Sequence, residues 1–163
     1  MFLIIEIMTK EELMRRAIEL AETNICNNGG PFGAIIADKE GNIISEGSNR
    51  VTFDHDPTAH AEINSIRKAC ATLNTFDLKG YEIYSSCEPC PMCLGAIYWA
   101  HLDHIYYANS RIDAQNIGFD DTFIYDEIAK DIPDRDIPAT QILRDEAIKT
   151  FTEWKNKEDK IEY

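Results

Sequence analysis

His60-Ala61-Glu62 and, further along the chain, Pro89-Cys90-Pro91-Met92-Cys93 govern the fold and the chemistry expected of this protein. Together they offer one imidazole and two thiolates, a set that binds zinc and leaves its fourth position to water. The sequence therefore predicts one Zn²⁺ per chain, held by His60, Cys90 and Cys93. Because a fourth protein ligand would close the site, Glu62 is expected beside the metal, as a general acid/base.

The spacing within these stretches predicts two helix starts. Residues two apart inside a helix do not share a face, so His60 and Glu62 converge only where a helix begins, as Pro57-Thr58 just upstream also indicates. Cys90 and Cys93 are three apart and share one face, and the intervening Pro91 suits the first helical position. The positive end of a helix dipole favours thiolates. Both helix starts are thus predicted to point at one metal.

Two other interpretations of the cysteines stay open. Cys87 lies three residues before Cys90 and would complete a closed, structural Cys₃His zinc site. The pair Cys90 and Cys93 alone is also the pattern of a redox dithiol. We place Cys87 beside the site and not on the metal, because Glu62 and Pro89 match the signature of zinc-dependent nucleobase deaminases.

The hydrophobic pattern alternates between helical and extended periods, which predicts an α/β layer sandwich. Residues 8–163 are expected to form a single domain, and Cys26, Cys70 and Trp99 are expected in its core. Helices are predicted over residues 9–27, after His60, from Pro91 onward, at 122–130 and at 145–156; strands are predicted at 33–38, 42–47, 81–86, 105–108 and 140–143.

The charge balance argues against a polyanionic partner. Lys and Arg total 16 against 29 Asp and Glu, a formal net charge of −13. Such a field repels a nucleic acid, and no cluster of basic residues with interleaved aromatics offsets it. We therefore expect a small-molecule substrate and no nucleic-acid partner.

The cysteine count and the N-terminus bear on location. Five cysteines, an odd number, do not form a disulfide framework, which predicts a reducing compartment, the cytoplasm. Residues 1–7 are apolar but lack a basic region and are too short for a signal-peptide core. They are interpreted as an N-terminal extension of uncertain role, and no membrane partner is expected.

Four stretches carry a family resemblance that runs from Met8 to Tyr163. They are Gly29-Gly30-Pro31-Phe32-Gly33-Ala34, Asp56-Pro57-Thr58-Ala59-His60-Ala61-Glu62, the run from Ser86 to Ala100, and Gly118-Phe119-Asp120-Asp121. The chain resembles the small bacterial guanine deaminases of the cytidine/deoxycytidylate deaminase superfamily. The first three stretches are shared with relatives that act on cytosine or tRNA adenosine; the fourth and the Glu162-Tyr163 ending point to guanine.

The resemblance implies a fold and an assembly. The fold would be a three-layer α/β/α arrangement around a central five-stranded mixed sheet. The assembly would be a homodimer with exchanged C-terminal segments, in which the tail 157–163 forms a lid over the active site. Tyr163, an aromatic residue with a free carboxylate, would cover the purine.

The resemblance also implies roles for individual residues. Asp121 would be a second proton carrier near the departing amine, although an Asp there is also a common helix cap. The substrate would contact Asn49, Phe32, Ala61, Glu88 and Phe119. Taken without the family, Asn49 is a turn residue, Phe32 a core aromatic and Glu88 a cap on a loop.

The expected reaction is the hydrolysis of guanine to xanthine and ammonia. Zinc lowers the pKa of its water, Glu62 takes a proton, the oxygen attacks C2 of guanine, and Glu62 returns the proton to the ring. Two alternatives stay open: a zinc deaminase of another base, such as cytosine or tRNA adenosine, and a non-catalytic zinc-binding module on the same scaffold.

Overall fold

The computed structural model describes residues 7–163, so the predicted N-terminal extension lies outside the described residues except for Ile7. The described chain falls into two compact units, one ending at Asp121 and the other spanning Thr122–Tyr163. In order, the elements are α1 (Lys10–Cys26), β1 (Gly33–Asp38), β2 (Ile43–Ser48), α2 (Val51–Asp54), α3 (Ala61–Leu73), β3 (Tyr81–Cys87), α4 (Pro91–Trp99), β4 (His104–Asn109), α5 (Arg111–Asn116), α6 (Thr122–Ala129), the 3₁₀ helix η1 (Ile132–Asp134) and α7 (Arg144–Asn156).

The first unit is built on a mixed four-stranded sheet in the order β2-β1-β3-β4. β1 pairs antiparallel with β2 and with β3, whereas β3 and β4 run parallel. The connection between the parallel strands contains α4, as a parallel pair requires a crossover. This arrangement places the end of β3 directly before the cysteine-bearing helix.

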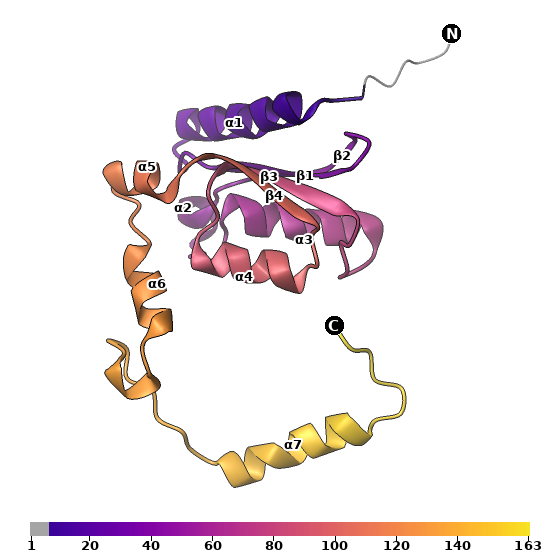
Figure 1. Cartoon of the computed structure of the whole chain (residues 1–163), viewed down its shortest axis with the longest axis vertical. Helices are drawn as coiled ribbons and strands as arrows, with labels where there is room; N and C mark the ends of the chain where they lie inside the picture. Colours follow the sequence, from indigo (N-terminus) through magenta and orange to yellow (C-terminus); the bar gives the residue numbers. More distant parts are fainter. Residues whose placement is uncertain (1–6) are drawn as a thin grey trace. The chain divides into compact units, whose positions relative to one another are not determined.

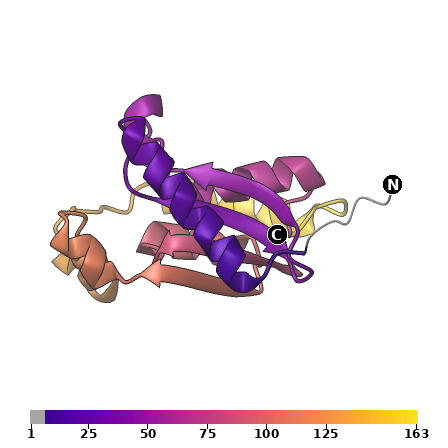
Figure 2. The same ribbon diagram turned by 90° about the horizontal axis from the view of Figure 1, so that it is seen from above.

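Helices cover both faces of this sheet, which gives three layers (Figure 1). Figure 2 shows α1 lying across one face. Side chains alternate along β1, so Ile35 and Ala37 pack with Leu13 and Ala17 of α1, while Ala34 and Ile36 belong to the opposite core. That second core contains Ala61 and Ala69 of α3 and Ile97 of α4.

Glycines let the helices approach the sheet closely. A Cβ atom added to Gly33 would lie 2.3 Å from the carbonyl oxygen of Ala17 in α1. A Cβ atom added to Gly47 would lie 2.2 Å from the carbonyl oxygen of Ala61, the first residue of α3. Both positions exclude any side chain, and the second one fixes how near the start of α3 lies to β2.

The prediction of a fifth strand is wrong for the described chain. The predicted segment 140–143 forms no strand and lies in the second unit, whose elements are all helical. A strand needs a neighbour to satisfy its backbone groups, and this unit offers none. Leu143 moreover takes a left-handed conformation (φ 54°) directly before α7.

Two core predictions are also wrong. Cys26, the last residue of α1, is exposed, and Trp99, the last residue of α4, is 66% exposed. Both stand at the C-terminal ends of their helices. Cys70 packs against the core below the sheet, as predicted.

The second unit has no buried core of its own. None of the residues in α6, η1 or α7 is buried. Many of its large apolar side chains are exposed, by 39–81%, among them Phe123, Ile128, Ile137, Ile142, Phe151 and Trp154. Helices obtain most of their stability from packing, so the exposed apolar groups mark a candidate interaction surface.

Candidate active site

The structure brings His60, Cys90 and Cys93 together at the starts of two helices. His60 is the N-cap of α3 and Cys90 the N-cap of α4, with Pro91 at the first helical position. His60 Nδ1 lies 3.6 Å from Cys90 Sγ and 3.5 Å from Cys93 Sγ. The three potential ligand atoms all lie within 4.8 Å of one another. The predicted helix starts are confirmed.

These spacings fit a tetrahedral zinc ion. With Zn–S of about 2.3 Å and Zn–N of about 2.0 Å, tetrahedral angles separate a sulfur from a nitrogen ligand by roughly 3.5 Å. The observed separations of 3.6 and 3.5 Å agree with that value. One imidazole and two thiolates form a three-ligand set, which leaves a fourth position for water.

The two thiols also behave as a metal-binding pair. A hydrogen bond from the Cys93 thiol lowers the pKa of Cys90 to about 4, helped by His60. The pKa of Cys93 is raised, chiefly because it gives that hydrogen bond to Cys90 and because it is buried. The shared hydrogen bond thus favours ionisation of Cys90 and opposes ionisation of Cys93. A bound metal would let both sulfurs ionise.

Glu62 is buried against the same group. Its side chain is only 6% exposed, and burial raises the pKa of the carboxyl. Oε1 accepts a hydrogen bond from Ser85 Oγ at 3.2 Å, and Oε2 lies 3.5 Å from Cys93 Sγ. A carboxyl group whose pKa is raised, beside the three potential metal ligands, is suited to taking up and releasing a proton.

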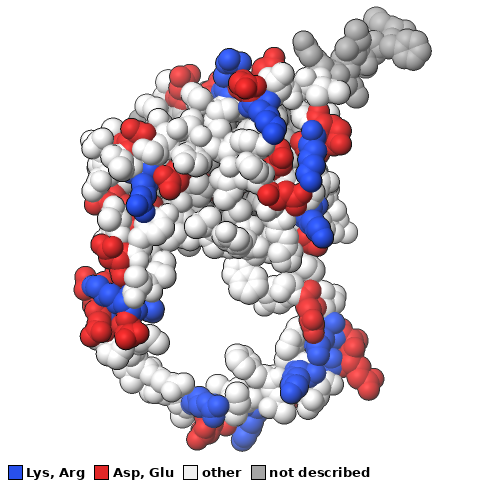
Figure 3. All heavy atoms as spheres, viewed as in Figure 1, with Lys and Arg blue, Asp and Glu red and all other residues white. Residues whose placement is uncertain are grey.

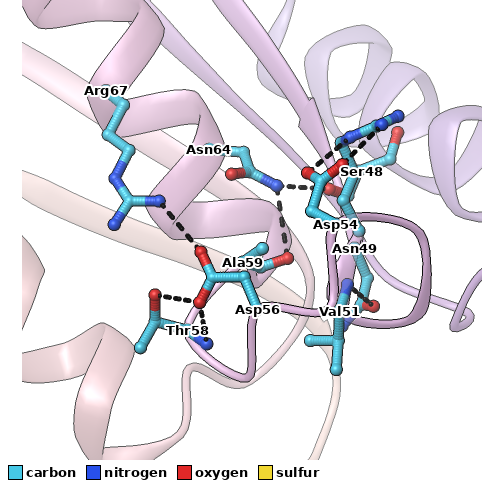
Figure 4. A network of polar contacts seen from close by, with 10 residues as sticks. Ser48, Asn49, Val51, Asp54, Asp56, Thr58, Ala59, Asn64 and Arg67 are labelled. Carbon is cyan, nitrogen blue, oxygen red and sulfur yellow. Dashed lines mark hydrogen bonds and ion pairs between the residues drawn. The ribbon is translucent and has the colours of Figure 1, made fainter.

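The loop that leads to His60 is held by polar contacts (Figure 4). Asp56 Oδ1 accepts hydrogen bonds from the backbone N–H and the hydroxyl of Thr58. Asn64 Nδ2 donates to the carbonyl oxygens of Ser48, at 2.9 Å, and of Ala59, at 3.2 Å. Since Ala59 directly precedes His60, Asn64 ties the imidazole-bearing loop to the end of β2.

Cys87 lies outside the metal group. Among the described residues the cluster contains only His60, Cys90 and Cys93. The Cys87 thiol points to the carbonyl oxygen of Ser110, 3.7 Å away, and burial raises its pKa to about 11. Its position outside the three-ligand cluster argues against a closed four-ligand site.

Two predicted substrate contacts, Phe32 and Phe119, meet in space. Their rings pack edge to face with centroids 5.0 Å apart. Phe32 and Cys87 also line a cavity of about 320 Å³, together with Pro31, Asn109, Asp113, Ala114, Asn116 and Ile117. The cavity thus borders Phe32 of the aromatic pair and Cys87, which ends β3 three residues before Cys90.

The pKa of Asp121 is affected by the negative charge of the site. Partial burial raises the pKa of its carboxyl, and the nearby Cys90 thiolate raises it further. Asp121 in turn contributes to raising the pKa of Cys87. The last residue of the first unit is therefore close enough to the cysteines to interact with them electrostatically.

The remaining predicted residues have mixed placements. Asn49 is buried, and its Oδ1 accepts from Val51 N at 3.2 Å, as in a turn. Glu88 Oε2 accepts from Arg111 N at 3.0 Å, so its carboxylate caps α5. Ala61 is fully buried as the first residue of α3, and Tyr163 is 74% exposed at the end of the second unit.

Sequence reasoning missed Ser85 and Asn64. Neither is a potential zinc ligand, and each acts on the site through another group. Ser85 hydrogen-bonds to Glu62, and Asn64 hydrogen-bonds to the loop before His60. Ser85 carried a usable signal, because it stands with Ser86 in a strand of otherwise large side chains, and buried hydroxyls need partners. Asn64 had no such signal.

The comparisons with known proteins agree with this geometry. Residues 7–109 match the family model of the cytidine and deoxycytidylate deaminase zinc-binding region. The guanine deaminase of Bacillus subtilis is 49% identical over 157 residues, 96% of this chain and 100% of the relative. The crystal structure of the guanine deaminase from that organism has a TM-score of 0.92 at 48% identity and covers 96% of this chain and 99% of its own.

A tRNA-specific adenosine deaminase from Aquifex aeolicus is 40% identical over 121 residues, 74% of this chain and 78% of its own length. None of the helices in the described part of the chain is both long and apolar enough to cross a membrane. The family model and the near full-length similarity lead to one conclusion. The chain belongs to the cytidine and deoxycytidylate deaminase family, whose members carry a zinc-binding region.

Proposed function

We propose that this protein is a guanine deaminase that hydrolyses guanine to xanthine and ammonia. His60, Cys90 and Cys93 hold the zinc ion, one per chain, and Glu62 is the general acid/base. When bound, zinc supplies the Lewis acidity that activates a water molecule for attack on C2 of the base. The assignment rests on the buried Glu62 carboxyl beside a three-ligand group that leaves one position open.

Glu62 moves the proton. Its Oε2 faces the ligand group, where it takes a proton from the attacking water and delivers it to the ring nitrogen. Asp121, whose pKa is raised by burial and by Cys90, holds a proton more readily than an ordinary Asp and gives it to the departing amine. As the amine leaves, the hydroxyl formed on C2 loses its proton to Asp121 and becomes the carbonyl group of xanthine. The products are xanthine and ammonia, and both acids return to their starting states.

The aromatic pair and Asn49 orient the base. The rings of Phe32 and Phe119, with centroids 5.0 Å apart, form an apolar surface against which a flat purine packs. Asn49 Oδ1 already accepts from Val51, whereas its Nδ2 makes no hydrogen bond among the described residues and is available to an acceptor on the base. Ala61 shapes the site as the first residue of α3, and Glu88 does so from the segment between β3 and α4, where its carboxylate caps the start of α5.

Guanine is favoured over a tRNA adenosine by two observations. Similarity to the guanine deaminase extends over 96% of this chain, against 74% for the tRNA-specific adenosine deaminase. The net charge is −13, and on the face seen in Figure 3 the Lys and Arg of the first unit are interspersed with Asp and Glu. That face therefore offers no continuous row of basic residues to bind a polyanion.

The proposed working unit is a cytoplasmic homodimer with exchanged C-terminal segments, in which residues 157–163 form a lid and Tyr163 covers the base. The second unit has no buried residue in its helices, and α4 of the first unit exposes Tyr98 by 73% and Trp99 by 66%. Apolar surfaces of this extent favour association. Residues 8–163 then act as one functional domain.

A panel of substrates tests the proposed activity. Zinc-loaded protein is incubated with guanine, cytosine, adenine and a tRNA anticodon arm, and ammonia release and the base product are measured. We expect xanthine from guanine and slow or no release from the others. Glu62→Gln is the matched control, because it keeps the shape of the side chain but moves no proton. Preferential turnover of the anticodon arm would overturn the assignment, and release of ammonia by Glu62→Gln would point to a contaminant.

A further inference from the structure

The hydroxyl of Ser85 is the single oxygen donor on the Glu62 carboxylate among the described residues. Ser85 lies in β3 and is 2% exposed. Its Oγ donates to Glu62 Oε1 at 3.2 Å, while the other oxygen, Oε2, lies 3.5 Å from Cys93 Sγ. The two oxygens of one carboxylate therefore face different groups: a hydroxyl in the sheet and a sulfur of the ligand group.

This contact restricts the carboxylate. The terminal torsion of a Glu side chain is broad, so nothing intrinsic keeps one oxygen toward the metal group. A hydrogen bond to a charged oxygen inside a buried site is strong enough to select one orientation. With Oε1 engaged by Ser85, only Oε2 is left facing the place where water and base react.

The neighbouring residue shows that the role belongs to Ser85 and not to serine in this strand generally. Ser86 is equally buried, at 3%, but its Oγ accepts a hydrogen bond from the backbone N–H of Gly33 at 3.0 Å. Consecutive side chains of a strand point to opposite faces, so Ser86 points away from Glu62. The two serines are matched in size, burial and strand, and they differ in what they contact.

We infer that Ser85 is a positioning residue that assigns the two oxygens of Glu62 different tasks, holding Oε1 so that Oε2 alone carries the proton. The inference rests on the proposed role of Glu62 in deamination. Ser85 touches neither the base nor the metal; it acts through the carboxylate. Its loss should therefore slow the proton transfers and leave substrate and zinc binding as they are.

Three variants test this role: Ser85→Ala, Ser85→Thr and Ser86→Ala. Each is loaded with zinc, and kcat, KM, zinc content and melting temperature are measured. Ser85→Ala should lower kcat by roughly 10- to 100-fold, the scale of a hydrogen bond to a charged group, with KM within about twofold and one zinc per chain. Ser85→Thr keeps the hydroxyl and should recover most of kcat. Ser86→Ala should lower the melting temperature but leave kcat near that of the unaltered protein.

Crystal structures of the zinc-loaded Ser85→Ala and Ser86→Ala variants provide a readout that does not depend on turnover. We expect the Glu62 carboxylate to adopt more than one orientation in Ser85→Ala and a single one in Ser86→Ala. The inference is overturned by an unchanged kcat in Ser85→Ala, by equal losses of kcat in both alanine variants, or by loss of zinc from Ser85→Ala. A folded, zinc-loaded Ser85→Thr as slow as Ser85→Ala also overturns it.

Failure of the proposed function looks different. If the unaltered protein does not deaminate guanine, the substrate assignment fails, whereas the carboxylate orientation in the two crystal structures still decides the role of Ser85. If guanine is deaminated and Ser85→Ala is as fast as the unaltered protein, the function stands and the positioning role fails.

Discussion

Phe32 and Phe119 meet edge to face, with ring centroids 5.0 Å apart and ring planes at 88°. Phe32 precedes β1, and Phe119 lies in the loop before Asp121, so a contact between residues far apart in sequence joins two of the stretches that carry the family resemblance. Such a pair contributes about 0.5–1.5 kcal/mol beyond the area it buries. In this pair each ring holds the other in place, so a flat ligand can pack against an aromatic face of fixed position.

Replacement of Phe119 should therefore weaken guanine binding. We expect Phe119→Ala to raise KM for guanine by roughly tenfold, since the aromatic wall and its support are both lost. Phe76→Ala is the control, because the two side chains are almost equally exposed, Phe76 by 49% and Phe119 by 48%. Phe76 follows the C-terminal end of α3, whereas the potential zinc ligand His60 lies at its N-terminal end. Steady-state kinetics on both variants decide the matter; equal KM values would remove Phe119 from the substrate site.

The ligand set predicts a clear order of zinc loss. Cys90→Ala and Cys93→Ala should each lose the metal, because a site with two remaining ligands binds weakly, whereas Cys87→Ser should keep it. Metal analysis after dialysis against a chelator measures the outcome. Loss of zinc from Cys87→Ser to the same extent as from Cys90→Ala would mean a closed, structural site.

Glu62→Gln separates metal binding from chemistry. The amide cannot take up a proton, so kcat should fall by roughly 10² to 10⁴, the scale for losing a positioned acid/base. Zinc content should stay at one per chain, since Glu62 contacts Cys93 but does not belong to the ligand group. Near-normal turnover in the folded, zinc-loaded variant would remove Glu62 from the mechanism.

Gly47 and Gly33 form a matched pair for the placement of α3. An added Cβ would lie 2.2 Å from Ala61 O at Gly47 and 2.3 Å from Ala17 O at Gly33, so both alanine variants should be destabilised, by about 1–3 kcal/mol. Only Gly47→Ala displaces the helix start that carries His60 and Glu62. A chelator competition should therefore show weaker zinc binding in Gly47→Ala alone; equal zinc affinities would show that the sheet absorbs both changes.

The C-terminal tail should matter for turnover more than for folding. Deletion of residues 160–163 removes a half-buried Lys160 and three exposed residues, so melting temperature and zinc content should change little. If the tail closes the site, guanine turnover should fall by an order of magnitude or more, because an open site admits water and loses a contact to the base.

Turnover equal to that of the full chain would identify the tail as a frayed terminus. Analytical ultracentrifugation of the intact protein addresses the assembly in the same experiment, and we expect a dimer. A monomeric mass at full activity would be evidence against segment exchange.

The sequence predicts the helices and strands around the three potential zinc ligands well, because residues close in sequence determine where these elements begin and end. Pro91 marks the start of α4, and the alternation of apolar residues marks β1 and β3. It fails at 140–143, where a short apolar run has no strand to pair with, and at Trp99, where helical spacing cannot tell that the helix has passed the edge of the core. These outcomes depend on which neighbours are present.

The same limit applies to the candidate site. His60, Glu62, Cys90 and Cys93 stand out because their chemistry and spacing are specific. Ser85 becomes visible only when β3 is placed beside α3, since a serine has many uses and its partner is 23 residues away. Contacts that orient a catalytic group are properties of the packing and leave little trace in a single sequence.

The N-terminal ends of α3 and α4 should respond to a shortage of zinc. α1 and α5 begin with capping boxes at Thr9 and Ser110, whereas His60 and Cys90 begin α3 and α4 without a side-chain cap. These two helices have a metal ligand at the position where α1 and α5 have a hydroxyl, so a bound ion would hold their first turns in place. When zinc is scarce, fraying should begin there, and amide hydrogens of those turns should exchange with solvent while the sheet still protects its own.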